Sequence, residues 1–164
     1  MAANKPKTHL QEAEKLTADG FVDLYEIRLK TVNTILRIKN NNSVTYLGNF
    51  YEGFPCEMSG EKRSSDDEES RPQLRIMNPE GVFNSLVRSR LLDQATVIRR
   101  RALLAHVTGN VNIFQQRMWY VSRPSEVIAG QSVTLELRGM TEGPNIQIPA
   151  RMFIPPAFPM VRLR

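Results

Sequence analysis

Covalent catalysis would have very few side chains to draw on in this sequence. Cys56 is the only cysteine, and His9 and His106 are the only histidines. The one thiol–imidazole pair, Cys56 with His106, lacks the strand–turn–helix setting that exposes a catalytic nucleophile, because the flanking residues read GFPCEMSG. A lone cysteine also leaves no internal disulfide, no cysteine-based zinc site and no iron–sulfur cluster. We therefore predict no catalytic residue, no metal and no cofactor, with Cys56 as a packed, inert thiol.

Acidic side chains could perform general acid–base chemistry, but only where a rigid frame holds them. Two acidic pairs, Asp66–Asp67 and Glu68–Glu69, fall in residues 59–70, SGEKRSSDDEES, which contain no apolar residue. Such a stretch predicts an exposed acidic loop and not a catalytic site. The glycines are scattered over turn positions, so the sequence has no glycine-rich phosphate-binding loop.

Three consecutive arginines, Arg99, Arg100 and Arg101, are the strongest local charge feature. Alternation along a strand places Arg99 and Arg101 on one face and Arg100 on the other. The charge is also uneven along the chain, with net −3 in residues 1–70 and net +8 in residues 71–164. For the arginine run, contact with phosphate groups and pairing with a neighbouring subunit are about equally good explanations, and ordinary solvated charge on a soluble surface explains the uneven charge of the two halves at least as well as either. We predict that Arg99 and Arg101 face either a lumen or a subunit contact.

Length and composition predict one folded domain. The chain has 164 residues, of which 41% are hydrophobic and 24% charged, as is usual for a soluble globular protein with a sizeable core. No apolar run approaches the ~18 residues of a membrane-spanning helix, and the N-terminal residues lack the apolar segment of a secretory signal. We therefore expect a protein that is assembled in a cytoplasm and does not contact a membrane.

The elements that would position the arginines lie between residues 71 and 107. Residues 72–77, PQLRIM, predict a strand, and residues 95–107, ATVIRRRALLAHV, predict a long one. Between them, Asn78 as N-cap and Pro79 at the first helical position predict a short helix. Its apolar stripe would consist of Val82, Phe83, Leu86 and Val87.

Further strands are expected on both sides of this unit. Residues 35–38 and 44–47 flank an asparagine-rich turn and predict a hairpin. Residues 113–122 predict a strand that Arg123–Pro124–Ser125 breaks. Alternation in two other strands predicts an apolar face formed by Phe21, Tyr25, Ile27 and Leu29 opposite Glu26, Arg28 and Lys30, and another formed by Val133, Leu135 and Leu137. Together these elements predict a mainly β (α+β) fold, a β-barrel or sandwich with a flanking short helix.

We predict three parts: an N-terminal arm and short helix (1–19), a β-rich domain (20–150) and a proline-rich C-terminal arm (151–164). Residues 141–164 hold five prolines, and each of them lacks a backbone donor, so this stretch is expected to be extended and not to join the sheet. The arm nevertheless carries large apolar side chains that need to be buried against something. Our candidates for an interface are Phe153, Ile154 and Phe158.

The order of these segments resembles the hub domain of the phage minor tail protein L family, from the tail tip of lambda-like long-tailed phages. The resemblance spans roughly residues 20–153 and rests on the segments YEI, VTYLGNFYEGFP, SRP, QLRIMNPEGVFNSLV, VIRRRALL, SVTLELRG and PAR. It implies a fold similar to that of tail-tube proteins, with packed β-sheets and a flanking helix. Lambda-type members continue into a cysteine-rich segment that holds an iron–sulfur cluster. This sequence ends at Arg164 without that segment, so no cluster is expected here.

The resemblance also implies a function, that of a non-enzymatic structural subunit of the tail tip or baseplate hub. The subunit would form a homo-oligomeric ring, a trimer or hexamer, at the distal end of the tail tube. Neighbours would be a distal tail or tube protein above and a central hub or fibre protein below, with transient passage of phage DNA. Exposed strand edges, uneven charge and an arm suit a ring subunit. The alternative is a nucleic-acid-binding module that uses the basic second half.

Overall fold

The computed structural model describes residues 11, 20–60, 71–78, 81–128 and 131–139. The predicted N-terminal arm and helix, apart from Gln11, lie outside these residues, as do the acidic loop beyond residue 60 and the C-terminal arm. The described elements are β1 (Phe21–Arg28), β2 (Ile35–Lys39), β3 (Val44–Tyr46), β4 (Asn49–Gly53), β5 (Cys56–Ser59), β6 (Gln73–Met77), α2 (Val82–Arg88), β7 (Thr96–Leu103), α3 (Leu104–Thr108), β8 (Gln115–Ile128) and β9 (Ser132–Arg138). The prediction of a mainly β fold with a short flanking helix is confirmed.

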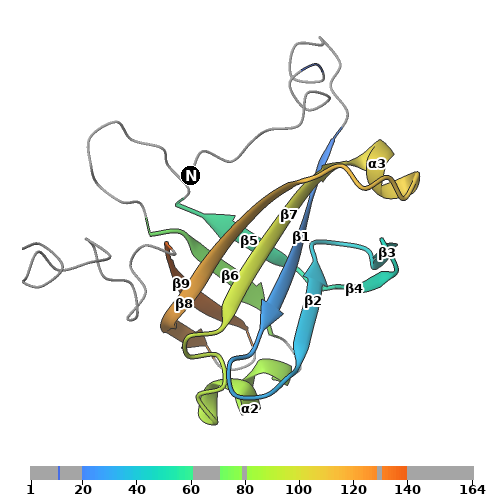
Figure 1. Ribbon diagram of the computed structural model, residues 1–164. Helices are drawn as coiled ribbons and strands as arrows, with labels where there is room; N and C mark the ends of the chain where they lie inside the picture. The colour runs from blue at the N-terminus through green and yellow to red at the C-terminus, as the bar shows by residue number, and fades with distance from the viewer. Residues whose placement is uncertain (1–10, 12–19, 61–70, 79–80, 129–130, 140–164) are drawn as a thin grey trace, which may run out of the picture.

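The described strands form one sheet, in the order β3-β4-β2-β1-β7-β8-β9-β6-β5. The sheet curls, so that β9, β6 and β5 lie behind β8, β7 and β1, and α2 covers one end (Figure 1). Side chains from both layers form a single inner apolar cluster, which includes Ile27 of β1, Leu74 of β6, Val97 of β7 and Leu135 of β9. The predicted apolar face of β9 is confirmed, because Val133, Leu135 and Leu137 are all fully buried in this cluster.

Strand β1 is buried on both faces, whereas its alternation predicted a polar outer face. Tyr25 and Ile27 enter the inner cluster as expected. On the outer face, Leu24 joins a second apolar cluster, and Glu26 is only 2% exposed. The cover comes from the β3–β4 hairpin and α3, which contribute Tyr46, Tyr51 and Val107 to this outer cluster. The hydroxyl of Tyr46 ties the hairpin to the segment after α3 by donating to the carbonyl oxygen of Val111 (2.6 Å).

Strand β7 ends at Leu103, earlier than predicted, and residues 104–108 form α3. The last bond to the neighbouring chain runs from the N–H of Leu104 to the carbonyl oxygen of Gly20 (2.9 Å), just before β1 begins. Past this point the chain turns into a helix, which buries Val107 against the outer cluster. The predicted strand up to Val107 is therefore wrong, because a helix brings Val107 back over the sheet.

The hairpin predicted from residues 35–38 and 44–47 is also wrong, because β4 lies between those two strands in the sheet. β3 pairs with β4 through a turn in which Leu47 (φ 50°) and Gly48 (φ 74°) are both left-handed, the geometry that matches strand twist. β2 pairs with β4 in parallel. A Cβ on Gly53 would lie 2.2 Å from the carbonyl oxygen of Asn41, so only glycine permits this close approach.

Pro124 lies within β8, although the sequence predicted a break there. The strand runs from Gln115 to Ile128, with two register shifts against β9 on either side of Pro124. Pairing with β7 extends only as far as Tyr120. The missing N–H of Pro124 therefore removes no hydrogen bond to β7. The two register shifts against β9 leave room for the proline ring within the strand.

Helix α2 begins at Val82, with the left-handed Gly81 (φ 69°) as N-cap, instead of at Pro79 after an Asn78 cap. Asn78 still contributes to the helix start, because its buried Oδ1 accepts a hydrogen bond from the N–H of Phe83 (3.1 Å). Phe83 in turn packs edge-on against Phe54, with ring centroids 5.5 Å apart. The predicted helix is present, and its tertiary contacts set where it starts.

Candidate functional site

The three arginines of β7 lie on alternating faces, as predicted, because β7 pairs with β1 in an uninterrupted register. Arg101 lies directly opposite Asp23 of β1, and Arg99 lies opposite Tyr25. Both belong to the inner face of the curled sheet, whereas Arg100 belongs to the outer face. Each guanidinium group is held between a carboxylate and an aromatic ring of the same chain.

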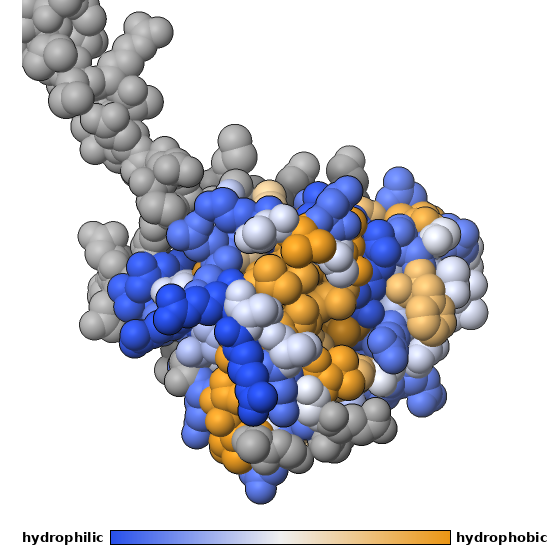
Figure 2. All heavy atoms as spheres, turned by 90° about the horizontal axis from the view of Figure 1, so that it is seen from below, coloured by the Kyte–Doolittle hydropathy of each residue, from blue (hydrophilic) through white to orange (hydrophobic). Residues whose placement is uncertain are grey.

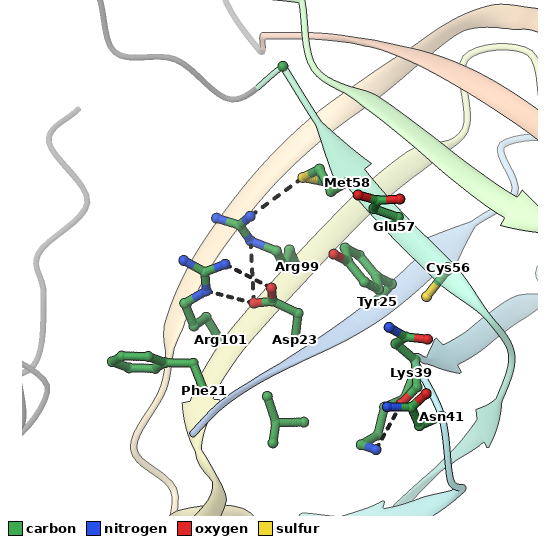
Figure 3. A pocket seen from close by; sticks show the side chains of 13 residues that line it. Phe21, Asp23, Tyr25, Lys39, Asn41, Cys56, Glu57, Met58, Arg99 and Arg101 are labelled. Atoms are coloured by element: carbon green, nitrogen blue, oxygen red, sulfur yellow. Dashed lines mark hydrogen bonds and ion pairs between the residues drawn. The ribbon is translucent and has the colours of Figure 1, made fainter. Parts of the chain in front are cut away.

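On the inner face, two arginines share one carboxylate (Figure 3). The Nε and Nη2 of Arg101 donate to the two oxygens of Asp23, at 2.7 and 2.8 Å. The Nε of Arg99 lies 3.9 Å from the same Asp23 oxygen. Aromatic rings cover both cations, Trp119 at 5.4 Å from the Arg99 guanidinium carbon and Phe21 at 6.0 Å from that of Arg101. Such contacts contribute about 0.5–2 kcal/mol each, more when desolvated.

Burial separates the roles of these two cations. Arg99 is 3% exposed, and desolvation lowers the pKa of its guanidinium despite the nearby carboxylate. The side chain of Arg101 is 38% exposed at the mouth of the site, and its hydrogen bond to Asp23 raises the pKa of its guanidinium. Arg99 is thus an internal cation, and Arg101 is the member of the pair that remains accessible from outside the groove.

On the outer face, Arg100 and Glu26 form a second, more enclosed ion pair. The Nη2 of Arg100 lies 3.1 Å from Glu26 Oε2, and its Nη1 donates to the hydroxyl of Tyr51 (2.8 Å). Glu26 also accepts from Arg28, at 2.9 Å. The ring of Phe114 covers the Arg100 guanidinium at 5.5 Å. This pair joins β1 and β7 to the β3–β4 hairpin.

A groove of about 570 Å³ opens between β5 and the ends of β1, β2 and β7. One wall carries Cys56 and Met58 of β5, and the facing wall carries Tyr25 and the Asp23–arginine cluster (Figure 3). The Nη1 of Arg99 spans the groove by donating to the sulfur of Met58 (3.5 Å). The groove is therefore lined both by apolar side chains of β5 and by the charged cluster of Asp23, Arg99 and Arg101.

Cys56 lines this groove as a protonated thiol, because burial, with a smaller effect of Asp23, raises its pKa to about 12. His106 lies in α3, whose Val107 belongs to the outer cluster, whereas Cys56 belongs to the inner one, so Cys56 and His106 lie on opposite faces of the sheet. Burial also raises the pKa of Tyr25, with Asp23 as the second cause. Among the described residues, Cys56 is therefore a protonated thiol without a histidine beside it to act as its base.

The sequence-based interface candidates Phe153, Ile154 and Phe158 fall outside the described residues. The partners of the arginines, above all Asp23, were not identified as site residues. Their sequence signal was present, since Asp23 and Glu26 lie on a strand expected from the sequence, and acidic side chains opposite basic ones stabilise an antiparallel pair.

Within the part of the chain that the structure describes, no three His, Cys, Asp or Glu side chains are grouped so that they could hold a metal ion. None of the described helices is both long and apolar enough to span a membrane.

Comparisons with known proteins identify a family from the sequence and a solved chain of similar fold. The model of the family described as "Phage minor tail protein L" matches residues 29–162. No curated protein matches the sequence. A solved chain described as "Virion of native gene transfer agent (GTA) particle" is similar in structure, with a TM-score of 0.61 and 12% identity, over 87% of this chain and 47% of that one. This chain thus spans about half the length of the solved one, and the likeness at 12% identity concerns the fold.

Proposed function

Because the chain belongs to the phage minor tail protein L family and is a structural component of a virion, we propose that it forms a ring at the distal end of the tail. The ring, a trimer or hexamer, connects the tail tube or distal tail protein to the central hub or fibre protein and surrounds the path of the DNA. The observation that carries this proposal is the family match over residues 29–162, nearly the whole chain.

Exposed apolar surface supports contacts with neighbouring tail proteins. Seen from the end that α2 covers, hydrophobic side chains form a central area and smaller areas separated from it by more polar side chains (Figure 2). Val82 of α2 is 52% exposed, and Leu86 and Val87 are only partly buried. Soluble monomers rarely leave large contiguous apolar patches in water, whereas subunits of assemblies bury them in interfaces.

The position of the chain in the particle tests the proposal directly. We expect an antibody or gold label on a tagged copy to mark the distal tip of purified tails in electron micrographs. Native mass spectrometry of tip complexes released from those tails should give an integral trimer or hexamer of this chain. A label along the tube or at the head-proximal end would contradict the proposal.

Charge reversal at the mouth of the groove should impair assembly more than folding. Arg101→Glu removes a partly exposed ion pair, which contributes about 0–1 kcal/mol to folding, and a contact to the Phe21 ring. It also places a second carboxylate opposite Asp23, a like-charge pair that costs up to about 1 kcal/mol. If Arg101 faces a lumen or a neighbouring subunit, as we propose, the melting temperature should fall only slightly and the yield of infectious tails should fall strongly. Arg123→Glu, at an exposed position of β8 that does not line the groove, is the matched control. If the Arg101 variant assembled normally, the proposal that Arg101 faces a lumen or a neighbouring subunit would be wrong.

No observation favours the nucleic-acid-binding alternative. The three guanidinium groups that suggested it each contact an acidic side chain and an aromatic ring of the same chain. Phosphate contact would have to displace those carboxylates. The basic strand β7 is therefore better explained as the part of the sheet that fixes β1 and the hairpin in place.

A further inference from the structure

The curled sheet is open at β5, and the hydrogen-bond pattern shows which backbone groups face the opening. The N–H of Met77 donates to the carbonyl oxygen of Pro55 (2.9 Å). In an antiparallel pair alternate residues exchange such bonds, so residues 57 and 59 also face β6, and the N–H and C=O groups of Cys56 and Met58 point away from it. β5 is the last strand in the sheet order, so no second strand among the described residues meets these groups.

The groove of about 570 Å³ runs along this same edge. Cys56, Met58 and Gly60 line one wall, and Tyr25 of β1 faces them from the other (Figure 3). Unpaired strand groups beside a groove that contains apolar side chains form a site for an extended segment, which adds to the sheet by main-chain hydrogen bonds.

The topology brings one segment of the same chain to this site. β5 and β9 both pair antiparallel with β6, so they run in the same direction, with Ser59 level with Glu136. A strand added beside β5 would lie three strand spacings from β9, about 14 Å. Residues 139–144 span up to about 20 Å when extended. The chain that leaves β9 can therefore reach the edge, and it would arrive antiparallel to β5.

The sequence after this connection has the pattern of a strand. The prolines after residue 140 predicted a segment outside the sheet, but residues 145–148 read Asn-Ile-Gln-Ile and keep their backbone donors, with Pro144 and Pro149 only at the two ends, where a strand tolerates proline. We propose that residues 145–148 add to the free edge of β5 in the same chain, with Ile146 and Ile148 facing the groove and Gln147 facing outward. The strand closes the open side of the sheet and fixes the point from which the C-terminal arm departs. This inference does not depend on the tail role.

Amide hydrogen exchange of the full chain tests the added strand. We expect the amides of Cys56 and Met58 to be protected in the wild-type protein, because main-chain bonds to the added strand occupy them. Ile146→Asp/Ile148→Asp places charges in the groove and should speed exchange at both amides by about fivefold or more, the equivalent of losing one hydrogen bond. Gln147→Asp adds a charge to the same segment on its outward side, and it should leave exchange unchanged.

Three results would overturn the proposal. The first is fast exchange at both amides in the wild-type chain, which needs no variant to fold. The second is equal exchange in the groove-facing double variant and in Gln147→Asp. The third is protection that rises with protein concentration, which would mean that the segment comes from a second copy. Nuclear Overhauser contacts between residues 145–148 and 56–58 in the wild-type protein would support the proposal independently.

Discussion

Glu26→Ala is expected to lower the free energy of unfolding by about 3–5 kcal/mol, the usual loss when one partner of a buried ion pair is removed. The Glu26 side chain is 3% exposed and accepts from both Arg28 and Arg100. Without it, Arg100 remains enclosed between the hairpin and Phe114 with the hydroxyl of Tyr51 as its remaining polar contact among the described residues. Chemical denaturation followed by tryptophan fluorescence of Trp119 would measure the loss.

Two controls separate the buried charge from simple truncation. Arg28→Ala removes the more exposed partner of Glu26 and should cost at most about 1 kcal/mol. Glu26→Leu/Arg100→Met removes both charges and fills the space with apolar groups, so it should recover most of the stability lost in the single variant. A loss below about 1 kcal/mol for Glu26→Ala would show that the carboxylate does not hold Arg100 in place.

Truncation after Ala150 is expected to abolish entry into tails while leaving the subunit folded. It removes the C-terminal arm with Phe153, Ile154 and Phe158, the proposed interface residues. Burying each of these side chains on an adjacent subunit is worth about 1.5–3 kcal/mol before the costs of association. The prolines of the arm favour an extended backbone, which reduces the entropy lost on docking. Tail incorporation would be measured by immunoblotting of purified particles.

The folded core gives a reason to expect that the truncated chain stays folded. The buried residues of both apolar clusters lie between Leu24 and Leu137 of the described chain. Truncation after Met160 keeps all three apolar side chains and is the matched control, which should assemble normally. An unfolded truncation product would show that the arm completes its own subunit, and normal incorporation would show that the arm is dispensable. Residues 145–148 are present in both products, so neither outcome affects the strand proposed at β5.

Local alternation was enough to predict several strands. In β9, a period of two placed Val133, Leu135 and Leu137 on one face, and that is the face that enters the inner apolar cluster. The same rule placed Arg99 and Arg101 opposite Arg100, and it holds because no bulge interrupts the pairing of β7 with β1. Apolar spacing likewise indicated α2, although not the residue at which it begins.

The tertiary structure alone decided which surfaces are covered. Leu24 and Glu26 occupy a face of β1 that its own sequence marks as polar, and they are buried because the β3–β4 hairpin and α3 lie over that face. The hairpin could not be predicted correctly, since asparagine- and glycine-rich turns offered two local pairings and the parallel contact of β2 with β4 selected between them. Pro124 remained in a strand because the pairing of β8 with β7 stops at Tyr120, so the missing N–H of Pro124 leaves no hydrogen bond to β7 unmade.

The arginine cluster shows both contributions in one strand. Its charge, its alternation and the acidic residues of β1 are all present in the sequence, and the family resemblance and the mainly β fold were predicted from sequence patterns. Which cation is internal and which is accessible depended on the curl of the sheet, which buries Arg99 against Trp119 and leaves Arg101 at the mouth of the groove. Burial of a charged group depends on long-range packing, because only neighbours distant in sequence can exclude water from it.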